Sequence, residues 1–172
     1  LLKPGFVLKK QPGEVLLVLD TSGSMHEFIN DRLQNVINEI YIAFKKIAHL
    51  YGVPSKFFQI DSDSRVLGIK EIKEIEELEN FKIKLGKYTD FKPVFDIVLN
   101  DWRKKYSKHN QKVPDFILFI TDLGANLDFL KNNEYAIFAD KLIWLVTGEF
   151  DKKPSIGTVI NVFADDWKAS TR

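Results

Sequence analysis

An aspartate and two serines alternate in the short segment from Asp20 to Ser24, directly after an apolar run. Their carboxylate and hydroxyl oxygens can face one point if this glycine-containing turn curls around it. Hard oxygens are the ligands that Mg²⁺ prefers, in octahedral geometry at about 2.0–2.1 Å and with several waters retained. The segment alone also fits a turn in which Asp and Ser side chains cap a helix. A metal site therefore needs further ligands from elsewhere in the chain.

Hydrophobic patterning places these residues on the elements of an alternating fold. Continuous apolar runs predict strands that are buried on both faces, as in a parallel sheet, at residues 15–19, 116–120 and 142–146. Weaker patterns predict strands at 57–61, 65–69 and 158–163. Apolar residues at helical spacing predict helices over 33–51 and 91–106 and over part of 127–139, whereas 71–80 fits a short surface helix or an extended connection.

Strands that alternate with helices indicate an α/β, Rossmann-like fold, with a central, mainly parallel sheet and helices on both faces. The 172 residues are the size of one domain, so we expect a single domain over 1–172. In such sheets, ligands bind beyond the carboxyl ends of the strands. Asp20 and Asp122 each follow a predicted buried strand, so both carboxylates should lie at the same edge of the sheet.

The segment from Asp20 to Ser24 resembles the Asp-x-Ser-x-Ser motif of the metal-ion-dependent adhesion site (MIDAS) of von Willebrand factor type A (VWA) domains. That family adds a threonine from a later loop and an aspartate after a buried strand, and Thr89 and Asp122 occupy these places in the chain order. The resemblance implies that Ser22, Ser24 and Thr89 bind Mg²⁺ directly and that Asp20 and Asp122 act largely through waters. Mn²⁺ also suits oxygen ligands.

The segment Thr89-Asp90-Phe91-Lys92-Pro93-Val94-Phe95 is similar to one in a bacterial subgroup, where a VWA-like domain forms the C-terminal part of predicted metallopeptidases. The zinc-type motif of that subgroup lies in an N-terminal region absent here, so we expect this domain itself to be no enzyme. Genes of the subgroup commonly neighbour MoxR-type AAA+ ATPases, which suggests this class as a partner. Where the family favours glycine after its final aspartate, this chain has Leu123.

The resemblance implies a protein-interaction module. Neutral hydroxyl ligands leave the ion's charge partly unquenched, so an Asp or Glu of a partner protein can fill an open position. One alternative is a metal-dependent phosphohydrolase with Asp20 as the nucleophile, although such enzymes carry a second acid where this chain has Ser22. Another is a structural VWA domain whose MIDAS is inactive.

Composition excludes several other classes. The formal net charge of +1 argues against a nucleic-acid partner, and no apolar run approaches the roughly 20 residues of a membrane span. The absence of cysteine excludes disulfides and thiolate metal sites, and three unclustered histidines do not make a zinc site. We interpret the chain, which lacks an initiator Met, as a fragment of a longer bacterial or phage protein that works in the cytoplasm.

Overall fold

The computed structural model describes residues 13–25, 31–51, 56–61, 69–78, 90–108, 110–147 and 152–161. Within these ranges, six strands form one sheet in the order β3-β2-β1-β4-β5-β6. The strands are β1 (Glu14–Leu19), β2 (Lys56–Asp61), β3 (Lys70–Ile72), β4 (Phe116–Thr121), β5 (Leu142–Val146) and β6 (Thr158–Asn161). All neighbours pair in parallel except β3, which runs antiparallel to β2.

β1 lies in the middle of the sheet, and all of its residues are buried. Its side chains alternate between two cores, because successive residues of a strand point to opposite faces. Leu16 and Val18 pack with residues of β4 and of the helix over one face, and Leu17 and Leu19 pack with the helix over the other face. Apolar residues on both faces of one strand therefore require a layer of helix on each side.

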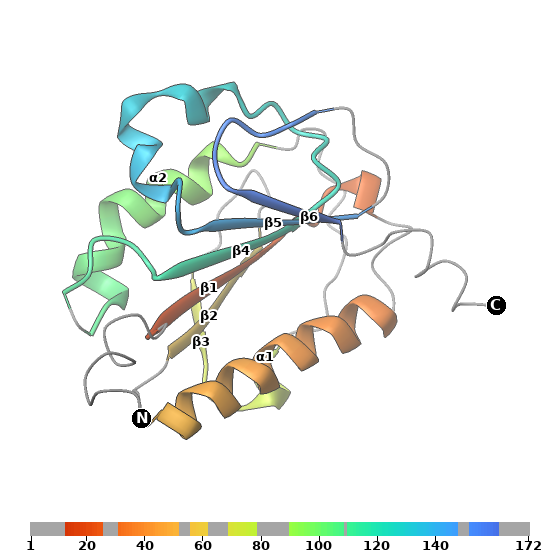
Figure 1. Cartoon of the computed structure of the whole chain (residues 1–172), viewed down its shortest axis with the longest axis vertical. Coiled ribbons are helices and arrows are strands. Elements are labelled where there is room, and N and C mark those ends of the chain that lie inside the picture. Colours follow the sequence, from red (N-terminus) through yellow and green to blue (C-terminus); the bar gives the residue numbers. More distant parts are fainter. Residues whose placement is uncertain are drawn as a thin grey trace, which may run out of the picture.

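The long helix α1 (Asp31–Tyr51) covers one face of the sheet, and α2 (Lys92–Asp101) lies on the other (Figure 1). Pro93 stands in the first turn of α2, where its missing N–H has no helical partner to lose. The helical pattern continues past α2 as a π-helical turn over Trp102–Tyr106. The predicted α/β class, with a mainly parallel sheet and helices on both faces, is confirmed. None of the helices in these ranges is long and apolar enough to cross a membrane.

The helix expected within 127–139 is wrong in type. Two 3₁₀ segments, η5 (Asp128–Lys131) and η6 (Asn133–Phe138), take its place. Asn132 between them adopts an extended conformation with ψ 142°, which interrupts any continuous helical hydrogen bonding. Asparagine hydrogen-bonds readily to local backbone and so favours turns over helix interiors. The apolar spacing of this segment was sound as a guide to burial, since Leu130, Tyr135 and Phe138 are in the core.

The sheet edge beyond β2 also differs from the sequence prediction. Most of the strand expected at 65–69 lies outside the described residues, and the observed strand β3 begins at Lys70. The segment expected at 71–80 as a helix or connection thus begins as a strand, followed by the short 3₁₀ segment η3 (Ile75–Glu77). Buried Ile72 next to half-exposed Glu71 gives the two-residue alternation of a strand. The strand expected at 158–163 ends at Asn161, and its last two residues lie outside the described ranges.

A polar network closes the amino end of β1. The carboxylate of Glu14 is fully buried, and its Oε1 accepts hydrogen bonds from Ser107 Oγ at 2.6 Å and from Trp102 Nε1 at 3.4 Å. The carboxylate of Asp115 accepts hydrogen bonds from the backbone N–H groups of Gly13 and Glu14. Side chains that precede β4 and follow α2 thereby fix the start of the central strand.

We predict that Gly157→Ala destabilises the fold at the turn before β6. Gly157 has a φ of +90°, and an added Cβ would lie 2.8 Å from Trp144 Nε1 and 2.9 Å from the backbone oxygen of Leu142. Left-handed backbone and overpacking each cost on the order of 1–3 kcal/mol, so urea denaturation should show a loss of about 2 kcal/mol or more. The control is Ser155→Ala in the same turn, at an exposed position. Equal stability of the two variants would contradict the prediction.

Candidate metal centre

The site is built on the two central strands of the sheet. β1 and β4 are parallel neighbours, and Leu19 pairs with Ile120. The next residue along, Asp20, continues the ladder through a hydrogen bond of 2.9 Å from its N–H to the oxygen of Ile120. Asp122 follows the last residue of β4. Strand register thus brings both aspartates to the carboxyl edge of the sheet, although they are far apart in the sequence.

The chain turns back immediately after Asp20. The N–H of Ser22 donates to Asp20 Oδ1 at 2.9 Å, and the N–H of Met25 donates to the oxygen of Ser22 at 3.0 Å. The 3₁₀ segment η2 (Gly23–Met25) forms this turn, and fully buried Met25 anchors its end in the core below α1. Ser24 remains exposed. The turn is therefore fixed by buried Met25 and presents the hydroxyl of Ser24 to solvent.

The two serine hydroxyls have the spacing that an octahedral ion requires. Ser22 Oγ and Ser24 Oγ lie 3.0 Å apart. Adjacent ligands of Mg²⁺, each about 2.0–2.1 Å from the ion and at a right angle, are separated by about 2.9 Å. The hydroxyls can therefore serve as neighbouring ligands with little rearrangement, and the hydrogen bond between them would give way to two bonds to the ion. On this measure the donor set fits a small divalent cation.

Asp20 is a carboxylate held away from water. Its side chain is 0% exposed, and burial raises its pKa above the ordinary value. Hydrogen bonds from Ser22 and Thr121 act in the opposite direction, and the negative charge of Asp122 raises the pKa further. Ionised Asp20 therefore lies in a place that would gain from a nearby cation, because burial penalises an uncompensated charge.

Asp122 is positioned by an unusual turn. Leu123 has a φ of +60°, the left-handed region that glycine enters at little cost. A leucine therefore occupies a backbone conformation that favours glycine. Its side chain is buried in the core, which compensates for the strained backbone. Asp122 Oδ1 accepts a hydrogen bond of 2.9 Å from the N–H of Gly124, where a Cβ would approach this oxygen to 3.0 Å.

The structure brings together Asp20, Ser22 and Ser24 in one loop and Asp122 in the next. The fifth predicted ligand, Thr89, lies outside the described residues. The described chain resumes at the following residue, Asp90, whose Oδ1 accepts a hydrogen bond of 3.0 Å from the N–H of Lys92 at the start of α2. Asp90 therefore lies just before Phe91, the N-cap residue, and binds one free backbone N–H of the first helical turn.

Thr121 is a positioning residue that sequence reasoning overlooked. Its fully buried hydroxyl donates to Asp20 Oδ2 at 2.7 Å and accepts from the N–H of Leu123 at 3.0 Å. One side chain thus links the first loop to the turn that carries Asp122. The available signal was a polar residue at the end of an otherwise apolar strand, next to a candidate ligand.

We predict that Asp20→Asn leaves the metal-free protein at least as stable as the wild type at neutral pH. A carboxyl whose pKa is raised on folding binds more protons in the folded state, so stability falls as pH rises through the folded pKa. Asparagine carries no charge, so the cost of burying an ionised carboxylate disappears. Its oxygen can accept from Ser22 N–H, and its amide can donate to Thr121 Oγ1. Thermal denaturation in a chelator should show an equal or higher midpoint for the variant.

The same measurement with Mg²⁺ provides the contrast. A ligand at one hundred times its Kd stabilises a folded protein by about 2.7 kcal/mol, and only the wild type should gain this. The metal-free advantage of Asp20→Asn should shrink as pH falls, since wild-type Asp20 then becomes neutral. A variant that is less stable in chelator at pH 7, or that gains equally from Mg²⁺, would contradict the interpretation.

The chain has a likeness to a VWA protein of known structure but to no family model. No protein-family model matches the sequence, and no curated protein matches it. Among solved structures, the chain is similar to the crystal structure of the ArnB paralog VWA2 from Sulfolobus acidocaldarius, with 16% identity and a TM-score of 0.44. The match covers 81% of this chain and 36% of that one, so the chain spans about a third of the length of that structure.

Proposed function

We propose that this chain is a VWA-type interaction module that binds one Mg²⁺ ion through Asp20, Ser22, Ser24, Thr89 and Asp122. The observation that carries the proposal is the pair of serine hydroxyls 3.0 Å apart beside a fully buried aspartate. The order of the motif along the sequence gives independent support, since each element falls where a MIDAS would need it. Mn²⁺ can replace Mg²⁺ at such oxygen ligands.

The proposed task of the ion is to bind a carboxylate of a partner protein. Direct ligands that are neutral hydroxyls leave most of the charge of a divalent ion uncompensated, and a partner's Asp or Glu completes its coordination. In this proposal, Asp20 and Asp122 contribute negative charge through hydrogen-bonded waters. A MoxR-type AAA+ ATPase is the partner class that we propose on the strength of the segment from Thr89 to Phe95.

A binding role accounts for the geometry of Asp20 better than nucleophilic catalysis. Both carboxylate oxygens already accept hydrogen bonds, one from Ser22 N–H and one from Thr121 Oγ. The side chain is also fully buried, so an incoming phosphoryl group has poor access to it. Ser22 supplies a hydroxyl where a phosphotransfer site of this kind would carry an acid. We therefore place the function of this domain in recognition.

We predict that Asp122→Ala weakens Mg²⁺ binding by at least tenfold. Removal of one of two carboxylates near the ion takes away about half of the compensating charge, and tenfold corresponds to about 1.4 kcal/mol. Calorimetric titration with MgCl₂ measures the change. The matched control is Asp128→Ala, an exposed aspartate shortly after the same strand. Equal heats for the wild type and Asp122→Ala would count directly against the site.

An open coordination position on the bound ion can be detected by the relaxation of water protons. Mn²⁺ bound at the site should relax the protons of its exchanging waters, and millimolar acetate should lower that relaxation by displacing a water. The same acetate titration on a Ser22→Ala variant should give no change beyond that of free Mn²⁺. Metal binding without an effect of acetate would indicate an ion with a structural role only, and would overturn the carboxylate-binding role. Phosphate release that depends on both Mg²⁺ and Asp20 would instead favour an enzyme.

A further inference from the structure

The outward side of α1 carries exposed apolar side chains among its basic ones in the C-terminal half of the helix. Ile42 is 42% exposed, Ile47 43% and Leu50 78%. A helix that packs one stripe against a sheet ordinarily presents polar side chains on the opposite side, and α1 does bury a separate stripe against the sheet. Single exposed apolar residues are common on protein surfaces, but Ile42 and Leu50 line the same concave part of the helix surface, which indicates a surface that is covered in use.

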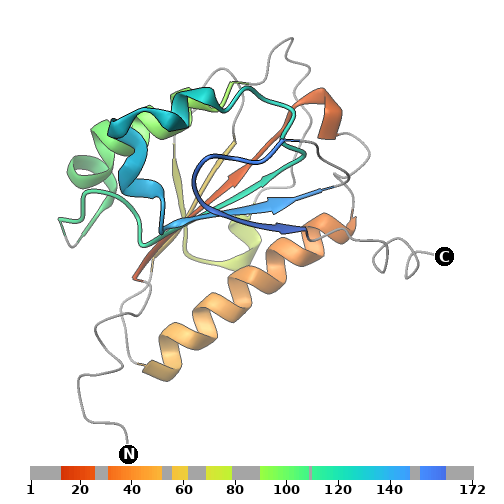
Figure 2. The same cartoon turned by 45° about the horizontal axis from the view of Figure 1, so that its top comes forward.

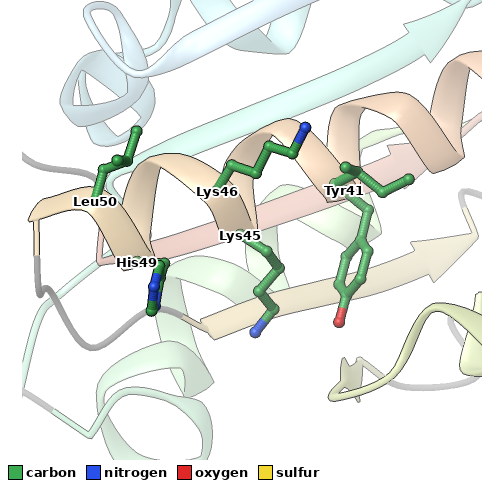
Figure 3. A pocket seen from close by; sticks show the side chains of 6 residues that line it. Tyr41, Lys45, Lys46, His49 and Leu50 are labelled. Atoms are coloured by element: carbon green, nitrogen blue, oxygen red, sulfur yellow. The ribbon is translucent and has the colours of Figure 1, made fainter.

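A groove of about 460 Å³ follows this side of the helix. Figure 3 shows Lys46 and Leu50 along one side of α1 and Tyr41, Lys45 and His49 along the other. Each row has a spacing of four residues and forms one of the ridges by which helices pack together. A groove between two such ridges accepts the ridge of another helix. We name it the α1 groove; it is lined by Tyr41, Ile42, Lys45, Lys46, His49 and Leu50.

Part of the α1 groove is held rigid by the fold. Tyr41 is 5% exposed, and its hydroxyl donates to the backbone oxygen of Lys73 at 2.8 Å. Its ring meets the ring of Phe57 edge to face, with 5.2 Å between centroids. Lys45 Nζ lies 5.6 Å from the centroid of the Tyr41 ring. A ligand would therefore find this side of the groove already ordered, which lowers the entropic cost of binding.

The charges beside the α1 groove select the kind of ligand. Lys45, Lys46 and His49 line it, and no acidic side chain is among the described residues that line it. Glu74, Glu76 and Glu77 lie near Tyr41, where their charges add to burial in raising the pKa of that residue. A second copy of the chain, related by twofold symmetry, would bring these lysines against the same lysines, which is unfavourable. We infer that the C-terminal half of α1 docks an amphipathic helix of a partner protein, with acidic residues beside its apolar stripe.

This surface is separate from the candidate metal centre. The loop from Asp20 to Ser24 lies toward the N-terminal end of α1, and the groove lies toward the opposite end (Figures 1 and 2). A helix rises about 1.5 Å per residue, so Leu50 lies about 28 Å along the axis from Asp31. The inference therefore stands or falls independently of metal binding.

The test uses a fluorescein-labelled peptide of about five helical turns, with leucines at i, i+3, i+4 and i+7 and glutamates beside them. Fluorescence anisotropy measures its affinity for the wild type in chelator. We expect the Lys45→Glu/Lys46→Glu double variant to lose on the order of tenfold in affinity, and Leu50→Ser a comparable factor. The matched control is Lys152→Glu/Lys153→Glu, which makes the same charge change at two exposed lysines before β6.

Further measurements distinguish which molecule binds in the α1 groove. Binding of the glutamate peptide, with loss in the α1 variants and not in the control, supports the inference once circular dichroism shows that all variants are folded. Equal binding by wild type and α1 variants, or equal binding of a peptide with lysines in place of glutamates, overturns it. Self-association by sedimentation that Leu50→Ser abolishes would assign the groove to a second copy instead. Binding to phosphatidylserine vesicles without peptide binding would assign it to a membrane.

Discussion

The candidate metal centre depends on the parallel pairing of β1 with β4. This ladder sets Asp20 beside the end of β4, so that Thr121 can bridge to it and Asp122 can approach it. A shift of one residue in register would send every side chain of β4 to the opposite face of the sheet. The two apolar cores prevent such a shift, because large side chains such as Phe119 fit only one of them. Packing at the centre of the sheet therefore fixes the positions of Asp20 and Asp122 at its carboxyl edge.

The first loop combines two opposing demands. Asp20 is fully buried and carries hydrogen bonds on both oxygens, whereas Ser24 is exposed at the end of the same turn. Burial of an acid is costly for the fold alone and becomes favourable when a cation is near. Leu123 is buried and has a left-handed backbone conformation, which is a second unfavourable contribution to folding free energy at the same edge. Such costs gather where a protein has a task beyond folding.

The sequence predicted most of the strands and both long helices, because continuous apolar runs and helical spacing report burial directly. It also predicted the common edge of Asp20 and Asp122, since parallel strands end on one side of a sheet. It failed where local hydrogen bonding overrides periodicity, as at Asn132, where a helix gives way to two 3₁₀ segments. The role of Thr121 escaped prediction because a bridge between loops depends on register, which one sequence does not display.

β1 holds a buried acid at each of its ends. Glu14 receives hydrogen bonds from Trp102 and Ser107 of its own chain, so that its acceptor Oε1 is occupied by internal donors. Asp20, which follows the other end, accepts one hydrogen bond on each carboxylate oxygen and lies beside the negative charge of Asp122. The two ends therefore differ: the buried Oε2 of Glu14 has no hydrogen-bond partner among the described residues, whereas Asp20 meets a second carboxylate at the edge where we propose the cation site. The six residues of β1 thus separate an acid held by side chains around α2 from an acid at the proposed cation site.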